Sequence, residues 1–314
     1  MTPTQTKSFP GWSASAIVVA LVLFVALAFL VGPSRAVLST AEAMARFQPP
    51  ADARLFYADN PSGFGDLRLP PGEGPFPVAV LIHGGCWLAG YDLGYVSGLA
   101  AAITAEGYAT WSIEYRRVGE EGGGWPGTFA DVAAAADHLR ILAGSYPLDL
   151  DRVVAVGHSA GGHLALWLAA RRVLAPDDLL RGGDPLALVG VVSLAGIPDL
   201  AAYNASEGCG SAVSGLLGGE PSEHPDRLGR ASPMELLPLG VSQVMISGGK
   251  DTIVPAVHAR NYAAAGGDDP IRTILVDSAG HFELVTPEGR AWEEIRKALR
   301  ELTPPRDPGG TAED

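Results

Sequence analysis

The sequence predicts an α/β fold, in which a mostly parallel central sheet is covered by helices on both faces. One observation is the alternation of short apolar runs with longer helical runs between residues 78 and 302, which is typical of parallel sheets joined by crossover helices. Another is the pentapeptide Gly157-His158-Ser159-Ala160-Gly161, which places a serine between two glycines where an apolar run gives way to a helical one. With 314 residues, of which 47% are hydrophobic, the chain can fill one large core.

The first elements of the folded region predict an antiparallel edge to this sheet. Residues 54–57 and 65–69 have the composition of two short strands, joined by the turn residues Asn60-Pro61-Ser62-Gly63. The run Val78 to Ile82 that follows is apolar throughout, as expected of a strand buried on both faces. The sheet is therefore expected to begin with a short hairpin and to continue with buried strands.

From there, strands and helices alternate along the chain. The predicted helices cover residues 95–106, 129–143, 162–172 and 287–302, and the predicted strands cover residues 108–114, 152–156, 188–194, 243–247 and 271–276. In an open sheet of this kind, the site lies outside the carboxyl ends of the strands. Residues just beyond those ends are therefore the candidates for chemistry.

One catalytic domain, residues 51–302, is the simplest organisation. Residues 199–240 break the alternation and are rich in Gly, Ser and Pro. They are predicted to form a lid or a wall of the substrate pocket, with a long solvent loop as the alternative. Residues 303–314 contain clustered prolines and glycines and are predicted to be a disordered tail.

Residues 1–50 are predicted to form a hydrophobic anchor or signal segment followed by a linker. Residues 16–31 are unbroken apolar sequence, with a length between that of a signal-peptide core and that of a membrane span, which needs about 17 to 25 residues. We favour an uncleaved anchor over a cleaved signal peptide. Either one attaches the protein to the membrane or exports it, with the catalytic domain outside the cytoplasm.

The charge and the cysteine count narrow the partners and the compartment. A formal net charge of -13 argues against a nucleic-acid partner, because no basic stripe is available to displace counterions from phosphates. Small molecules are the expected ligands. The two cysteines, Cys86 and Cys209, are too few for a disulfide scaffold. They either form one bridge, which would tie the segment around Cys209 over the pocket, or remain free thiols.

Ser159 is the candidate nucleophile, and its position predicts which residues assist it. A serine hydroxyl is a weak nucleophile at neutral pH, so it needs a base to take its proton and an acid to orient that base. Among the seven histidines, His281 is predicted to be the base because it lies just past the last strand and before the terminal helix. Asp251, immediately beyond the strand over 243–247, is predicted to be the acid. The resulting chain order Ser, Asp, His is the order expected for a sheet of this type.

Competing residues have weaker positions. Asp277 and Glu283 are close to His281 in sequence, but a residue on the same loop seldom reaches the far ring nitrogen of the histidine. His83 is predicted to brace the loop that follows it. No pair of histidines has a zinc-binding spacing with a third ligand, so neither a metal nor a cofactor is predicted.

The loop His83-Gly84-Gly85-Cys86-Trp87 is predicted to hold the oxyanion of a tetrahedral intermediate. It follows the buried strand over 78–82, and Gly84 and Gly85 can present backbone N–H groups without a side chain in the way. The N–H of Ala160, the residue after the nucleophile, completes the predicted oxyanion hole. Trp87 is predicted to line the substrate pocket.

These motifs resemble the α/β-hydrolase superfamily over residues 51–302, and the resemblance implies the α/β-hydrolase fold. His83-Gly84-Gly85-Cys86-Trp87 is similar to the His-Gly-Gly-x-Trp motif of kynurenine formamidase-type and related bacterial esterases. The hormone-sensitive-lipase group typically has a third glycine where Cys86 stands. The pentapeptide around Ser159 has the layout of a nucleophile elbow, a sharp turn between a strand and a helix, and this elbow is also similar to that of prolyl-oligopeptidase-like enzymes.

The resemblance implies a triad of Ser159, Asp251 and His281, with Gly84, Gly85 and Ala160 as oxyanion residues. Glu114-Tyr115-Arg116 is similar to a structural motif of these folds, in which the charges brace loops. The predicted function is a serine hydrolase that cleaves small carboxylic esters, or aryl formamides, through an acyl-enzyme. A prolyl-oligopeptidase-like peptidase and a non-catalytic binding protein on a hydrolase scaffold remain as alternatives.

Overall fold

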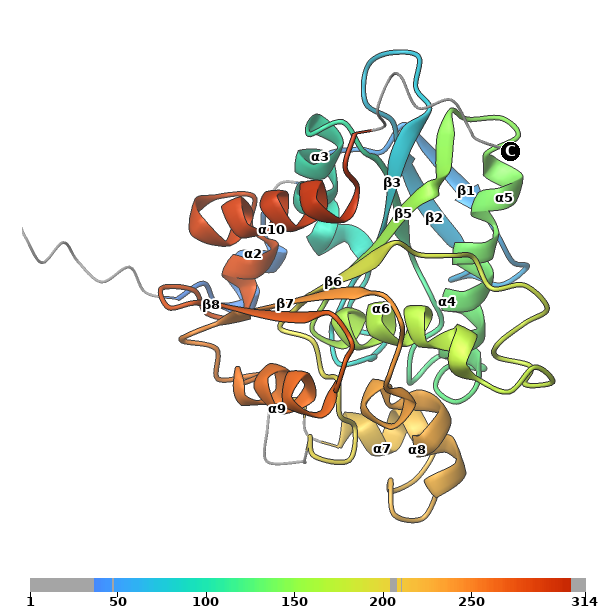
Figure 1. Cartoon of the computed structure of the whole chain (residues 1–314), viewed down its shortest axis with the longest axis vertical. Helices are drawn as coiled ribbons and strands as arrows, with labels where there is room; N and C mark the ends of the chain where they lie inside the picture. The colour runs from blue at the N-terminus through green and yellow to red at the C-terminus, as the bar shows by residue number, and fades with distance from the viewer. Residues whose placement is uncertain (1–36, 47, 204–207, 210, 306–314) are drawn as a thin grey trace, which may run out of the picture. The chain divides into compact units, whose positions relative to one another are not determined.

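An eight-stranded sheet lies at the centre of the residues that the computed structural model describes, which are 37–46, 48–203, 208–209 and 211–305. The strand order is β1-β2-β4-β3-β5-β6-β7-β8 (Figure 1). The strands are β1 (Ala53–Phe56), β2 (Phe64–Arg68), β3 (Phe76–Ile82), β4 (Ala109–Ile113), β5 (Leu148–His158), β6 (Gly190–Leu194), β7 (Ser242–Gly248) and β8 (Ile271–Val276).

The sheet is parallel except at one edge. Strands β3 to β8 pair in parallel, whereas β2 pairs antiparallel with both β1 and β4. Strands β4 and β6 are buried at every position, because a strand with helices on both faces needs apolar or paired side chains on both. The predicted fold class and the predicted antiparallel edge are confirmed.

Helices cover both faces of the sheet. Helices α3 and α10 lie on one face, and α4, α6 and α9 lie on the other (Figure 1). The helices are α2 (Thr40–Met44), α3 (Ser97–Ala105), α4 (Gly127–Asp137), α5 (Leu139–Leu142), α6 (Ala160–Ala170), α7 (Ala212–Leu217), α8 (Pro225–Ala231), α9 (Val257–Ala265) and α10 (Gly289–Leu302).

Two helices show how the two layers differ. Helix α10 buries Ala291, Ile295, Ala298 and Leu299, which recur at helical spacing, so one stripe packs on the sheet while the other side faces outward. Helix α6 is buried at every position, as expected of a helix that is apolar all round. Since α6 directly follows Ser159, the element behind the candidate nucleophile is fixed on all sides.

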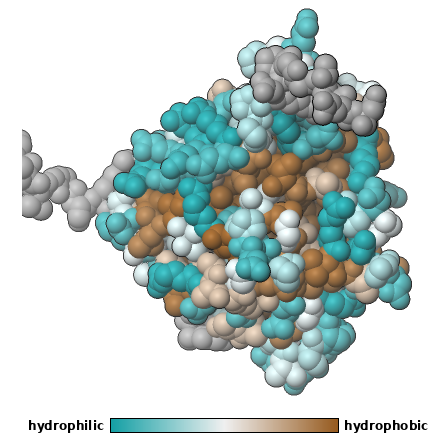
Figure 2. Space-filling model, viewed as in Figure 1, coloured by the Kyte–Doolittle hydropathy of each residue, from teal (hydrophilic) through white to brown (hydrophobic). Residues whose placement is uncertain are grey.

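Hydrophobic side chains are not confined to the interior. In Figure 2 hydrophobic residues gather across the middle of the face seen in Figure 1, and hydrophilic residues surround them. Among the described residues, the large hydrophobic side chains with the greatest exposure are those of Leu179, Ile141 and Phe56.

Several boundaries differ from those predicted. The strand that enters the elbow begins at Leu148, and the long helix predicted over 129–143 is divided into α4 and α5. Part of the predicted linker forms α2, whose start is closed by a capping box between Ser39 and Glu42. The composition of the segment does not reveal α2, because a helix of five residues is too short to produce a periodic pattern.

The two ends of the chain lie largely outside the described residues. Residues 1–36, which include the apolar run, and residues 306–314 of the predicted tail are not among them. Thr303, at the start of that tail, is buried, and its hydroxyl lies 2.7 Å from the Tyr108 hydroxyl. Among the described residues, no helix has the length and apolar character needed to cross a membrane.

Candidate active site

Ser159 lies at a sharp corner between β5 and α6. Its backbone has φ 58° and ψ −122°, in the positive-φ region that residues other than glycine rarely adopt. A Cβ added to Gly157 would lie 2.0 Å from the Gly161 carbonyl oxygen, and one added to Gly161 would lie 2.1 Å from the Ile82 carbonyl oxygen. Both glycines are therefore required for strand and helix to approach, which is the geometry predicted for a nucleophile elbow.

His281 and Asp251 are joined by a hydrogen bond. Asp251 follows β7 and His281 follows β8, and the His281 Nδ1 lies 2.7 Å from Asp251 Oδ2. Both residues are buried, with 8% and 6% of the surface of Asp251 and His281 exposed. The predicted acid and the predicted base are therefore in contact, whereas Asp277 is exposed and is not among the described hydrogen-bond partners of His281.

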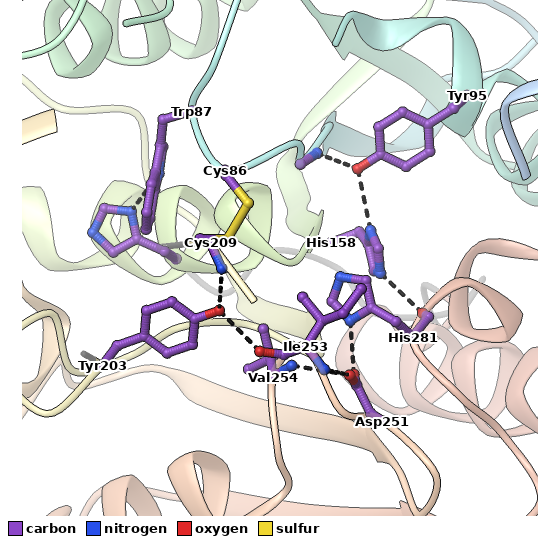
Figure 3. Close-up of a disulfide and its surroundings, with 12 residues drawn as sticks. Cys86, Trp87, Tyr95, His158, Tyr203, Cys209, Asp251, Ile253, Val254 and His281 are labelled. Carbon is purple, nitrogen blue, oxygen red and sulfur yellow. Dashed lines mark hydrogen bonds and ion pairs between the residues drawn. A yellow bond between two sulfur atoms is a disulfide. The ribbon is translucent and has the colours of Figure 1, made fainter. Parts of the chain in front are cut away.

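The second carboxylate oxygen of Asp251 is also occupied. The backbone N–H groups of Ile253 and Val254 donate to Asp251 Oδ1 at 2.8 and 2.9 Å (Figure 3). These bonds fix the rotation of the carboxylate, so Oδ2 faces the imidazole. The carboxylate of Asp251 is thus oriented by its own loop as well as by its bond to His281.

The glycine loop after β3 has a different arrangement from the one predicted at one position. The Gly84 N–H donates to the Tyr95 hydroxyl, so this candidate oxyanion donor already has a partner. Gly85 has φ 101°, and Cys86 and Trp87 have φ 55° and 58°. Positive φ is strained for Cys86 and Trp87 but not for Gly85, and such strain is common at functional sites.

His158, inside the elbow, connects that loop to the loop that bears His281. Its Nδ1 lies 3.1 Å from the Tyr95 hydroxyl, and its Nε2 lies 3.1 Å from the His281 carbonyl oxygen (Figure 3). Burial, and then the charge of His281, hold the pKa of His158 well below its usual value. The ring is therefore neutral.

The directions of these bonds follow from that neutral ring. The His281 carbonyl can only accept, so His158 Nε2 carries the proton and Nδ1 accepts. The Tyr95 hydroxyl then donates to Nδ1, and its oxygen accepts the Gly84 N–H. A single directed chain of hydrogen bonds thus links the glycine loop, the elbow and the loop that bears His281.

Trp87 does not line the cavity, which corrects the prediction. It is fully buried, and its indole N–H donates to His163 Nδ1 at 3.2 Å. A buried indole ring stabilises the fold when its N–H also has an acceptor, and Trp87 has both the burial and the acceptor beneath the loop. Burial lowers the pKa of His163 to about 4, which keeps Nδ1 free to accept.

His83 braces the loop, as predicted. Its Nδ1 lies 2.8 Å from the Gly84 carbonyl oxygen and its Nε2 lies 2.7 Å from Glu114 Oε1. Burial alone would raise the pKa of Glu114, but the charge and hydrogen bond of His83, the charge of Arg117 and a backbone hydrogen bond together outweigh burial and lower that pKa. The Tyr115 hydroxyl donates to the His83 carbonyl at 2.8 Å, so the motif after β4 supports the loop from below.

Cys86 and Cys209 form a disulfide, which settles the alternative left open by the sequence. The bridge joins the glycine loop to the segment that follows β6. The Tyr203 hydroxyl accepts the Cys209 N–H at 3.2 Å and donates to the Ile253 carbonyl at 2.9 Å (Figure 3). The segment that was predicted to form a pocket wall is therefore joined both to the glycine loop and to the loop that bears Asp251.

Ser159 and His281 line a shared cavity of about 130 Å³. Its walls come from the glycine loop, from the disulfide-tied segment and from α2. The other lining residues are Thr40, Met44, Gly85, Cys86, Tyr91, Tyr95, His158, Gly208, Ile253 and Phe282. Larger hollows of about 440 and 480 Å³ are lined by none of the predicted site residues.

Sequence reasoning missed Tyr95, Thr40 and Met44. The sequence pattern places Tyr95 only in a predicted helix, and it places the two residues of α2 in the predicted linker. A tyrosine shortly after a glycine loop gives no signal that its hydroxyl returns to that loop. The capping pattern Ser39-x-x-Glu42 was the available signal for α2.

The sheet order and the elbow together define the chain as an α/β-hydrolase. A family model gives the more particular assignment, since the model named BD-FAE matches residues 66–265. The chain belongs to the BD-FAE family. The matched segment includes the glycine loop, the elbow and Asp251, and it ends before His281.

Known proteins similar to the chain include several named as esterases. Esterase LipC of Mycobacterium tuberculosis is 24% identical over 74% of this chain and 57% of its own length. The chain thus spans little more than half of that relative. Among solved structures, a truncated carbohydrate esterase from gut microbiota has a TM-score of 0.69 and 24% identity, covering 81% of this chain and 98% of that one.

A second solved structure agrees on the fold. Esterase B from Lactobacillus rhamnosis has a TM-score of 0.69 and 18% identity, covering 92% of this chain and 96% of that one. At these identities the two structures establish the α/β-hydrolase fold and do not identify a substrate.

Proposed function

We propose that the protein is a serine hydrolase that cleaves small carboxylic esters through an acyl-enzyme. The observation that carries the proposal is the arrangement of Ser159 on a strained elbow, in one cavity with a histidine that is hydrogen-bonded to Asp251. The esterase names of its relatives support the ester as the substrate class.

In the proposed reaction, His281 acts first as a base and then as an acid. Its Nε2 takes the proton of Ser159 as the hydroxyl oxygen attacks the ester carbonyl carbon, and the proton then passes to the leaving alcohol. Water attacks the acyl-enzyme by the same steps in reverse. Asp251 stabilises the imidazolium that forms in each half of the reaction.

Backbone donors are proposed to stabilise the oxyanion. Gly85 lines the cavity, and Ala160 is the first residue of α6, where unpaired N–H groups and the helix dipole favour negative charge. We assign the oxyanion to these two N–H groups. The Gly84 N–H instead holds the loop in place through its bond to the Tyr95 hydroxyl. Loss of that bond would reduce activity by displacing the loop.

The size of the cavity favours small substrates. At about 130 Å³ it is slightly smaller than the about 150 Å³ cavity that can hold one benzene molecule. The His-Gly-Gly-x-Trp pattern keeps an aryl formamide as a second candidate substrate, because the same acyl-transfer chemistry would cleave it.

We also propose that the catalytic domain works outside the cytoplasm, exported or anchored through residues 16–31. That apolar run and the Cys86–Cys209 bridge support this location, since disulfides persist mainly in oxidising compartments. Fractionation of the producing cells, with thiol labelling before and after reduction, tests it. Reduced cysteines on a protein recovered from the cytoplasm would contradict it.

The test of function is a substrate panel on the wild-type protein and on Ser159→Ala. The panel contains p-nitrophenyl acetate, N-formylkynurenine and an aminoacyl anilide. Hydrolysis of the acetate by the wild type, with loss of at least about 10³-fold in the variant, is expected. A preference for the anilide would identify a peptidase, and no turnover of any substrate would identify a binding protein.

A further inference from the structure

The segment of residues 37–46, which we call the N-terminal strap, forms one wall of the candidate active site. Thr40 and Met44, on the single short helix of the strap, line the cavity beside Ser159 and His281. The composition of this segment predicts a linker. Its side chains instead occupy a position from which they limit the space next to the nucleophile.

The strap is fastened to the loop that bears His281. The Leu38 N–H donates to Glu283 Oε1, and the Gly280 N–H donates to Glu283 Oε2 at 3.0 Å. One carboxylate thus connects the strap to the residue that precedes the catalytic histidine. The position of the strap and the position of the loop are consequently linked.

Packing reinforces this connection. A Cβ added to Gly280 would lie 3.0 Å from the Val37 side chain, so the strap lies directly against the loop. Ala43, on the inner side of α2, is buried. The Arg46–Glu288 ion pair at 3.3 Å is largely exposed and adds little, because surface pairs contribute about 0–1 kcal/mol.

We infer that the strap determines substrate specificity, and that Met44 limits the size of the ester that the cavity accepts. The inference rests on the proposed esterase function. Met44 is half-buried and unbranched, so its removal enlarges the cavity without unpairing a polar group. Neither its chemistry nor its position gives it a role in proton transfer.

The test compares substituted full-length proteins on three esters. The measured quantities are the kcat/KM ratios of p-nitrophenyl hexanoate to p-nitrophenyl acetate and of 2-naphthyl acetate to p-nitrophenyl acetate. Met44→Ala is expected to raise at least one ratio by about tenfold, since each added methylene is worth about 10- to 200-fold where a pocket discriminates by size. Met44→Phe is expected to lower the same ratio.

Met234→Ala is the matched control. Met234 is also a half-buried methionine, but it does not line the cavity, so both ratios should stay at the wild-type value. Glu283→Gln leaves a single acceptor oxygen for the N–H groups of Leu38 and Gly280, so the strap is held less firmly against the loop. This variant should shift the ratios in the same direction as Met44→Ala.

The outcomes separate this inference from the proposed function. Wild-type hydrolysis with both ratios unchanged in Met44→Ala would overturn the role of the strap and leave the esterase assignment intact. Absence of ester hydrolysis in the wild-type protein would overturn both. A changed ratio in Met234→Ala equal to that in Met44→Ala would also contradict the inference, because the effect would then not come from the cavity wall.

Discussion

The proposed catalytic residues and the walls of the cavity are held in place in different ways. Ser159, Asp251 and His281 follow β5, β7 and β8, and parallel strands bring residues beyond their carboxyl ends to one edge of the sheet. The walls depend instead on contacts between distant segments. The Leu38–Glu283 bond spans 245 residues and the Cys86–Cys209 bridge spans 123.

This difference indicates which properties of the site can vary independently. The backbone hydrogen bonds of the sheet position the three proposed catalytic residues, so a substitution in a cavity wall is expected to leave their arrangement intact. A few side-chain contacts fix the walls, so single substitutions can change selectivity. Substitutions at the strand ends are therefore expected to reduce kcat most, and substitutions in the walls to act through stability, loop position or substrate choice.

The largest effect is expected for Asp251→Asn. The amide would place a donor opposite His281 Nδ1 and favour the wrong tautomer, so kcat should fall by about 10⁴-fold, as for the equivalent change in a Ser-His-Asp protease. Steady-state hydrolysis of p-nitrophenyl acetate measures it. Asp277→Asn is the control, since this exposed residue should leave kcat unchanged. Equal losses in the two variants would contradict the assignment of the acid.

Removal of the disulfide should have the next largest effect. The double variant Cys86→Ser/Cys209→Ser loses a cross-link over 123 residues, and native disulfides typically contribute about 2–4 kcal/mol to the free energy of unfolding. Urea unfolding measures the loss. Reductant should destabilise the wild type by a similar amount and leave the double variant unaffected. A reductant-insensitive wild type would show that the bridge does not form.

A pH effect of similar size is expected from His163. Its pKa of about 4 lies below the ordinary value of 6.5, so between these pH values the unfolded chain binds a proton that the folded chain does not. Stability from this group is complete above pH 6.5 and declines as the pH falls to 4, by about 3 kcal/mol.

The variant His163→Gln isolates this contribution from that of other titrating groups. Glutamine can still donate to the Ala231 carbonyl, which His163 Nε2 now contacts at 2.9 Å, but it does not titrate. The unfolding free energy of the wild type minus that of the variant should fall by about 3 kcal/mol between pH 7 and pH 4, because only the wild type loses the contribution of His163. A constant difference would mean that His163 is not held neutral.

The smallest effect is expected for Tyr95→Phe, which breaks the chain between the oxyanion loop and His158. It leaves the Gly84 N–H and His158 Nδ1 without their partner, which should lower stability by about 1–3 kcal/mol and also reduce kcat. Tyr108→Phe is the matched control. It removes a buried hydroxyl bond to Thr303, so it should cost stability with kcat unchanged. Equal kcat in the two variants would remove Tyr95 from the positioning chain.

The sequence predicted the strand-end residues because they depend on local patterns. Continuous apolar runs define the central strands, and the residues that follow them become candidates once the sheet is known to be parallel. The elbow was recognisable because only glycine fits at Gly157 and Gly161. The bracing role of His83 was predicted from its place before the loop glycines, whereas its partner Glu114 is known only from the structure.

The residues that sequence could not place depend on tertiary contacts. The direction of Trp87 is decided by the acceptor on His163, and the partner of Gly84 is decided by the hydroxyl of Tyr95. The strap was missed because its short helix is stabilised by a loop more than 200 residues away. None of these contacts leaves a periodic pattern in the sequence.

Covalent capture of the nucleophile tests the central claim most directly. The full-length protein is treated with a fluorophosphonate, digested and mapped by tandem mass spectrometry. The account predicts one adduct, on the Ser159 hydroxyl, which is absent from Ser159→Ala and reduced in Asp251→Asn because the base is misoriented. An adduct on another residue, or no adduct on a protein that hydrolyses esters, would contradict the assignment of Ser159 as the nucleophile.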